Sequence, residues 1–276
     1  MFSLLSRLYP SIFTVFFLGV LFGNAAVLRN PFVGAVALLV GLVVFGSWTG
    51  RLVAPGERGA LRAWMGAWTL LSAIMIVGAA CYYAAAFTAP AALSIAGLMG
   101  PCAWLVSHRH RAKHPHERLD GPRHRVPGPV WLTVALALAA LAATLATLAN
   151  SATTASIRST WEVVPTSAFV AFFVATLGVC ALLFRGRERA MTLPLASAAI
   201  LTMIVAAVLV FPLGFGFDPF IHQATEAHIA EFGTISPKPF YYVGQYVLVL
   251  FLNHAFAIPI GLADATLVPI LTALLL

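Results

Sequence analysis

The chain has 276 residues, of which 61% are hydrophobic and 9% are charged, and its formal net charge is +7 at pH 7. A soluble domain averages about 45–50% apolar and about 25% charged residues, so this composition excludes soluble α/β, all-β and disordered proteins. The chain is therefore expected to be a membrane protein built from helices or from a barrel. Its apolar runs, such as residues 192–211, have the length of about 20 that a membrane helix needs, rather than the about 10 alternating residues of a barrel strand.

The apolar runs predict an all-α, polytopic helical membrane protein with about eight transmembrane helices in a single transmembrane domain over residues 1–276. The expected spans cover about residues 10–28, 32–50, 63–87, 91–107, 129–148, 166–184, 192–213 and 241–260. A ninth run begins after Asp264 and is still apolar at Leu276. It is either a half-span or the start of a span in a longer protein, and we favour the second interpretation.

The distribution of lysine and arginine predicts the orientation, because cytoplasmic loops are richer in these residues. If the N-terminus is cytoplasmic, 13 of the 16 fall on cytoplasmic segments, and only Arg29, Arg158 and Lys238 face the other side. The bias predicts a cytoplasmic N-terminus and places the loop 214–240 on the non-cytoplasmic side. The same alternation puts Asp264 on the cytoplasmic side.

Residues 108–126 form the most charged stretch, with five histidines among six lysines and arginines. A metal site or a pH sensor is one interpretation, since histidine titrates near neutrality. We favour a solvated cytoplasmic loop whose cations lie near anionic lipid headgroups. The loop has no aromatic residue on which a base stacks, so nucleic acid is not an expected partner.

The loop 214–240 gathers five ionisable side chains within 14 positions: Asp218, His222, Glu226, His228 and Glu231. Asp218 followed by proline predicts a helix start, because aspartate caps a helix and proline suits its first turn. Gly233 predicts the end of that helix. The helix is too short to span and is expected to lie along the membrane surface as an amphipathic interfacial helix. His222 and Glu226, four residues apart, share one of its faces.

After this helix the sequence continues with a Gly-x-Ile-x-Pro turn at 233–237 and a tyrosine-rich segment that re-enters the membrane. This order of features, over residues 210–252, resembles the first external loop of the C-type glycosyltransferases, which include oligosaccharyltransferases and protein mannosyltransferases. The resemblance implies a multi-span enzyme that takes its sugar from a polyprenyl-phosphate donor. It also implies that Asp218 binds a divalent metal or acts as the base toward the acceptor, with His222 and Glu226 as further catalytic candidates.

Two alternatives come from other classes of protein. A transporter carries ionisable residues within its spans, broken helices and internal repeats, whereas the spans here hold few polar residues besides Asn24, Asn253 and His254. In a non-catalytic membrane scaffold, the polar residues of the loop are helix caps and interfacial anchors. The gathering of acids and histidines in one loop favours the enzyme.

Overall fold

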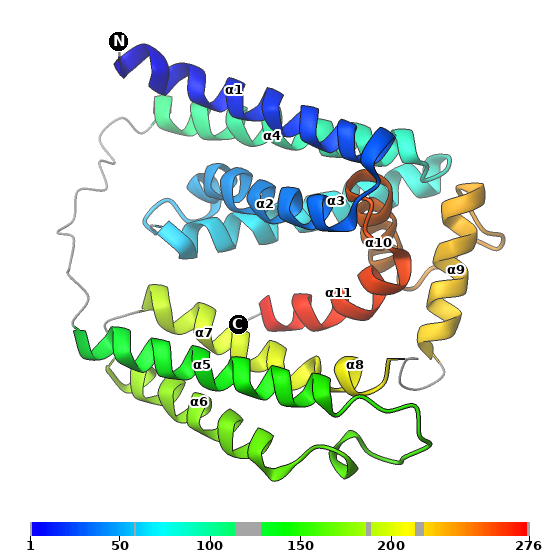
Figure 1. The fold of residues 1–276 in the computed structure, drawn as a ribbon. Helices are drawn as coiled ribbons and strands as arrows, with labels where there is room; N and C mark the ends of the chain where they lie inside the picture. The colour runs from blue at the N-terminus through cyan, green and yellow to red at the C-terminus, as the bar shows by residue number, and fades with distance from the viewer. Residues whose placement is uncertain (1, 58, 114–127, 186–188, 213–217, 275–276) are drawn as a thin grey trace. The chain divides into compact units, whose positions relative to one another are not determined.

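The structure, a computed structural model, describes residues 2–57, 59–113, 128–185, 189–212 and 218–274. All regular elements in these ranges are helices (Figure 1), which confirms the predicted all-α class. Six of them are long and apolar enough to cross a membrane, with spanning windows at Pro10–Leu28, Pro31–Val53, Gly59–Ala84, Ala89–Arg109, Gly128–Asn150 and Thr166–Arg185. The chain is thus a multi-pass integral membrane protein, and it divides into two compact units.

Two expected loops fall partly outside the described residues. Of the histidine-rich segment 108–126, only the part up to Lys113 is described, and it continues a helix. Of the loop 214–240, the structure describes the residues from Asp218 onward. The interpretation of the basic loop therefore stays a prediction.

The first unit comprises residues Met1–Asp120 and Ile221–Asp264. Its long helices are α1 (Phe2–Gly23), α2 (Pro31–Val53), α3 (Gly59–Ala84) and α4 (Ala89–Lys113), with the short π-helix η1 (Asn24–Leu28) after α1. The unit also contains most of α9 (Asp218–Phe232), all of α10 (Val243–Phe256) and the first turn of α11 (Ile260–Leu274). The turns from α1 to α2 and from α3 to α4 lie at one end of this bundle, here named the Asn30 end (Figure 1).

Glycines let the antiparallel helices α2 and α3 pack backbone against backbone. A methyl group added at Gly66 of α3 would overlap the carbonyl oxygen of Gly46 in α2, and one added at Gly50 would overlap that of Arg62. Gly46 and Gly50 have the four-residue spacing of small residues that favours close helix packing in membranes. Because lipid provides no hydrophobic drive between helices, this close packing stabilises the unit.

Two asparagines fix the turn between α1 and α2. The Asn30 side chain caps α2 by accepting hydrogen bonds from two N–H groups of its first turn, and Pro31 occupies the first helical position. The buried Asn24 accepts a hydrogen bond from the Asn30 N–H (3.0 Å) and donates one to the carbonyl oxygen of Phe256 (3.2 Å). The turn is therefore tied to the last residue of α10.

Helix α10 is short and enclosed by protein. Its 14 residues rise about 21 Å, which is less than the about 30 Å of a hydrocarbon core. Every residue from Tyr246 to Leu252 is buried, and the helix packs against α1, α2, α3 and α4. At Gly78 of α3, even a methyl group would overlap the Val247 side chain. The apolar composition of α10 therefore serves burial within the bundle.

Helix α10 runs across α1–α4 rather than alongside them (Figure 1). Before α10, Lys238 donates hydrogen bonds to carbonyl groups at the end of α3. After α10, Phe256 accepts the hydrogen bond from Asn24. The structure thus differs from the expected span over 241–260: a transverse helix replaces it, because an apolar run fits a buried helix as well as a span.

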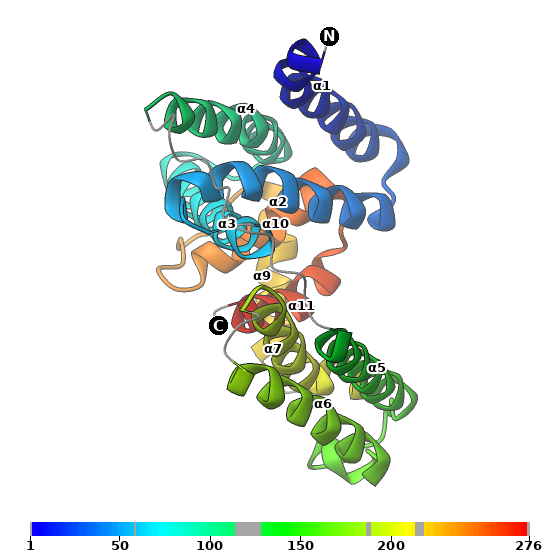
Figure 2. The same cartoon turned by 90° about the vertical axis from the view of Figure 1, so that its left-hand side faces the viewer.

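The second unit comprises residues Gly121–Phe220 and Ala265–Leu276. Its helices α5 (Gly128–Asn150), α6 (Thr166–Arg185) and α7 (Arg189–Ile204) pack side by side around small and branched residues (Figures 1 and 2). The expected seventh span is divided, since α7 ends at Ile204 and α8 (Ala206–Val210) follows. In the η2 turn (Thr160–Glu162), Glu162 accepts a hydrogen bond from the Ser159 N–H and acts as a cap.

Candidate functional site

Helix α9 begins and ends where the sequence predicts. It runs from Asp218 to Phe232, and Gly233 follows with a left-handed backbone (φ 77°), the conformation that glycine supplies at helix ends. The Gly233 N–H donates to the Ile229 carbonyl (2.7 Å), and the Gly233 carbonyl accepts from the Phe87 N–H (2.9 Å). The end of α9 is therefore fixed to the turn between α3 and α4.

Lys238 secures the segment between α9 and α10. Its ammonium group donates hydrogen bonds to the carbonyl oxygens of Tyr82, Tyr83 and Ala85 at 2.8, 3.1 and 3.2 Å. These carbonyls end α3, where the helix dipole and the free carbonyl groups stabilise a cation. All three donors of the ammonium are in use, so Lys238 has a structural role in this loop.

Glu226 has an unusual environment for an acid, since its side chain is 0% exposed. Neither of its carboxyl oxygens has a hydrogen-bond partner in the described part of the chain. Burial raises the pKa of Glu226 from 4.5 to about 9, and the nearby negative charge of Asp264 contributes further. The side chain therefore keeps its proton at neutral pH.

Asp264, near the start of α11, is buried beside α9. Its two oxygens accept hydrogen bonds from the amide groups of Gln245 in α10 (2.9 Å) and Gln223 in α9 (3.3 Å). This position corrects the expectation that Asp264 and the loop 214–240 face opposite sides of the membrane. The expectation counted α10 as a span, whereas α10 stays at the Asn30 end and returns the chain to α9.

His222 connects α9 to the start of α10. Its Nδ1 atom lies 2.8 Å from the Tyr246 hydroxyl, and its ring centre lies 4.7 Å from that of Tyr242. The ring is half-buried. His222 is therefore held in place by tyrosines, with one ring nitrogen engaged in a hydrogen bond.

Asp218, His222 and Glu226 occupy positions i, i+4 and i+8 of α9 and follow one stripe of the helix. Each step rises about 6 Å, which separates the first residue from the last by about 12 Å. Along this row the side chains pass from exposed Asp218 through half-buried His222 to fully buried Glu226. The three predicted residues thus form a row rather than converge on one point.

The acids and histidines do not form a metal cage. Over residues 2–57, 59–113, 128–185, 189–212 and 218–274, no three His, Cys, Asp or Glu side chains lie close enough together to hold a metal. A magnesium-type ion needs fewer protein ligands, because it keeps waters and binds through one or two carboxylates plus a substrate phosphate. Exposed Asp218 fits such a carboxylate, and His222 lies one helical turn away.

Sequence reasoning missed three members of the site: Asp264, Gln223 and Gln245. A single acid in an apolar stretch, such as Asp264, is a signal in its own right, since it marks a paired or functional group. The glutamines carry no such signal, because each lies many positions from its partner in the sequence. These three residues and Glu226 are named the carboxyl cluster below.

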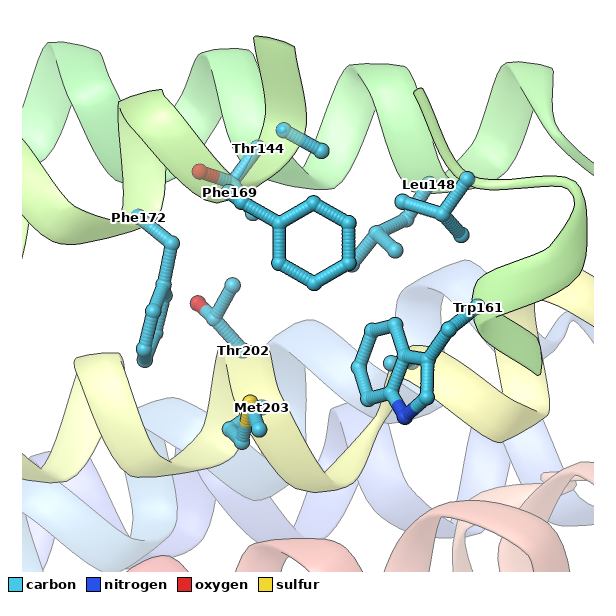
Figure 3. Close-up of a pocket in the computed structure, with 10 residues that line it drawn as sticks. Thr144, Leu148, Trp161, Phe169, Phe172, Thr202 and Met203 are labelled. Carbon is cyan, nitrogen blue, oxygen red and sulfur yellow. The ribbon is translucent and has the colours of Figure 1, made fainter. Parts of the chain in front are cut away.

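A second feature, in the other unit, is a small apolar pocket between α5, α6 and α7 (Figure 3). It encloses about 60 Å³, and Trp161, Phe169 and Met203 are among its lining residues. The hydroxyl groups of Thr144 and Thr202 point to carbonyl oxygens of their own helices at 2.9 and 2.8 Å. The pocket therefore offers packing space without a reactive group.

The comparisons with known proteins add no relative. No model of a known protein family, no curated protein and no solved structure matches this chain. The function is therefore inferred from the residues of α9 and of the carboxyl cluster.

Proposed function

We propose that the protein is a membrane enzyme of the C-type glycosyltransferase kind, which transfers a sugar from a polyprenyl-phosphate donor at the start of helix α9. The observation that carries the proposal is the row of ionisable side chains on α9, which begins with an exposed carboxylate, Asp218. A second carboxylate, Asp264, is bound beside the same helix. The low count of lysine and arginine in the loop 214–240 and in the other segments assigned to its side favours the non-cytoplasmic face.

The reaction needs a group that Asp218 supplies. A bond forms between the acceptor oxygen and the anomeric carbon, the bond from that carbon to the phosphate oxygen breaks, and the acceptor proton must leave. An exposed carboxylate at the start of an interfacial helix is placed to take that proton. A divalent metal held by Asp218, with His222 nearby, would neutralise charge on the leaving phosphate.

The buried residues are assigned a positioning role. Glu226 is fully buried and holds its proton at neutral pH, so it is unsuited to act as the base. Asp264 accepts hydrogen bonds from side chains of both α9 and α10 and so links these helices. His222 and Tyr246 add a second link between them. The carboxyl cluster thus holds the exposed start of α9 in a defined orientation.

A transporter is the second candidate, and the discontinuous α10–α11 pair favours it. Transporter binding sites are often built where a helix is interrupted and buried polar groups line the break. Here α10 ends at Phe256, α11 begins at Ile260, and buried Asp264 follows one turn later. A transporter would move its substrate across a sealed membrane unchanged, whereas the enzyme releases polyprenyl phosphate.

The test uses the full chain in liposomes with a polyprenyl-phosphate-linked radiolabelled sugar and a membrane extract as the source of acceptor. Asp218→Asn keeps a good helix cap but removes the base and metal ligand. We expect the release of polyprenyl phosphate to fall at least about 100-fold. Glu231→Gln, which removes another exposed acid of α9, should leave the rate unchanged.

Two outcomes would count against the enzyme. Equal release by Asp218→Asn and the unaltered chain would remove Asp218 from the reaction. Accumulation of intact donor inside the liposomes, with no polyprenyl phosphate formed, would establish the transporter instead. A loss of activity on chelation that returns with magnesium would assign the metal role to the site.

A further inference from the structure

The first unit contains a cavity that the proposed reaction does not use. It encloses about 380 Å³ at the Asn30 end, between η1, the start of α4 and the end of α10. Its polar lining residues are Arg29, Asn253 and His254, and its apolar ones include Phe22 and Leu93. None of its lining residues is acidic, so it differs in charge from the carboxyl cluster.

Arg29 brings an unpaired positive charge to this cavity. Its backbone is held in the left-handed region (φ 46°), and its N–H donates to the carbonyl oxygen of Asn24 at 2.7 Å. The side chain is exposed and forms no ion pair or hydrogen bond within the residues that the structure describes. Since Asn24 and Asn30 fix the turn on both sides, the guanidinium group is presented from a defined backbone.

A polar residue and the start of a helix also line the cavity. His254 is a lining residue, and its Nε2 atom is buried without a hydrogen-bond partner in the described ranges. Ala89, the first residue of α4, also lines the cavity, and the N-terminal end of a long helix carries a partial positive charge.

The end of α10 also lines the cavity, and some of its carbonyl groups accept hydrogen bonds. The carbonyl oxygens of Leu252 and Phe256 accept hydrogen bonds from the Ile258 N–H (3.2 Å) and the Asn24 side chain (3.2 Å). The Asn253 side chain donates to the Ile258 carbonyl at 3.0 Å. Arg29 is the lining residue that brings a permanent charge to the cavity.

We propose that this cavity binds the phosphate group of an anionic membrane lipid, with Arg29 as the main contact. A guanidinium group donates two parallel hydrogen bonds to phosphate oxygens. Phe22 is exposed and Leu93 half-buried, and both offer apolar surface to the first carbons of a lipid chain. The site is independent of the proposed glycosyl transfer, because it shares no residue with α9 or the carboxyl cluster.

The test measures lipid binding by the purified full chain in detergent. Phosphatidylglycerol and phosphatidylcholine are titrated separately, and bound lipid is counted by native mass spectrometry. We expect phosphatidylglycerol to bind preferentially and Arg29→Gln to weaken this binding about fivefold. Arg158→Gln, which removes an exposed arginine of the second unit, is the matched control and should bind as the unaltered chain does.

Two further measurements test the proposal: one uses a variant that fills the cavity, and the other uses inorganic phosphate as the ligand. Leu93→Trp fills the cavity while keeping Arg29, and it should also reduce phosphatidylglycerol binding. Inorganic phosphate alone distinguishes the source of the anion: binding of free phosphate that Arg29→Gln abolishes would identify a site for soluble phosphate with the same chemistry. Equal binding of phosphatidylglycerol by Arg29→Gln, Leu93→Trp and Arg158→Gln would overturn the proposal.

Discussion

Replacing Glu226 by glutamine should stabilise the protein at neutral pH. Glutamine has nearly the same shape and has no proton to lose. Burial, and then the charge of Asp264, raises the pKa of Glu226 from 4.5 to about 9. The folded chain therefore keeps a proton that the unfolded chain releases as the pH rises above 4.5, so the stability of the unaltered protein falls through this window.

The size of the effect follows from the linkage between proton binding and folding. Each pH unit between the two pKa values lowers the free energy of unfolding by about 1.4 kcal/mol. At pH 4.5 and below, both states hold the proton and the ionisation of Glu226 contributes no difference between the two chains. At pH 7 the glutamine variant should be more stable by about 3 kcal/mol, and above pH 9 by about 6 kcal/mol.

The assay is thermal unfolding of the full chain in detergent at pH 5, 7 and 8. The gap in melting temperature between Glu226→Gln and the unaltered chain should widen with each step. Glu231→Gln is the control, because Glu231 lies on the same helix and is exposed. A gap that is the same at pH 5 and pH 8 would refute the reasoning. So would the absence, at pH 7, of an infrared band from a protonated carboxyl that Glu226→Gln removes.

Two further predictions concern the architecture of the first unit. Gly66→Val should lower the free energy of unfolding by about 1–3 kcal/mol, because the valine side chain must push α2 away from α3. Gly56→Ala is the control: Gly56 has open space around it, so this change should have little effect in the same thermal assay. Tyr241 and Pro259 are exposed and lie on either side of α10. In a chain whose exposed Cys102 has been replaced, Tyr241→Cys and Pro259→Cys should each react with an impermeant maleimide from the same side of sealed vesicles. Labelling from opposite sides would show that α10 spans the membrane.

Local chemistry explains which parts of the structure the sequence predicts correctly. The helical membrane class follows from composition and from the length of apolar runs. The bounds of α9 follow from Asp218, Pro219 and Gly233, since each of these residue types has a strong preference at a helix end. These predictions depend on residues close together in the chain, and the structure confirms them.

The orientation of α10 was not predictable in the same way. A run of apolar residues is equally suited to lipid and to the interior of a bundle. The sequence of residues 241–260 therefore predicts a span although the helix is buried in the protein. One local signal was available, because the run is interrupted near Pro259; the helix in the structure has only 14 residues. Pairing across the bundle decides its direction, and the bond from Asn24 to Phe256 joins residues that are 232 positions apart.

The same limit applies to the carboxyl cluster. The spacing of His222 and Glu226 predicts a shared helix face, which the structure shows, but it does not reveal that Glu226 is buried. Burial depends on residues that are distant in the chain, as where Gln223 of α9 and Gln245 of α10 both donate hydrogen bonds to Asp264. An error in the direction of one helix was therefore enough to place Asp264 on the wrong side of the membrane relative to α9.

Helix α10 connects the two sites proposed for the first unit. Its first turns carry Gln245 and Tyr246, which bond to Asp264 and His222, and its last turn carries His254 toward the cavity. Nine residues, or about 13 Å of helix, separate Gln245 from His254. Because α10 is enclosed by four helices and bonded at both ends, it cannot shift at one site without disturbing the other. A lipid in the cavity would therefore influence the carboxyl cluster only through a movement of the whole helix, and only if it bound the two positions of the helix with different affinity.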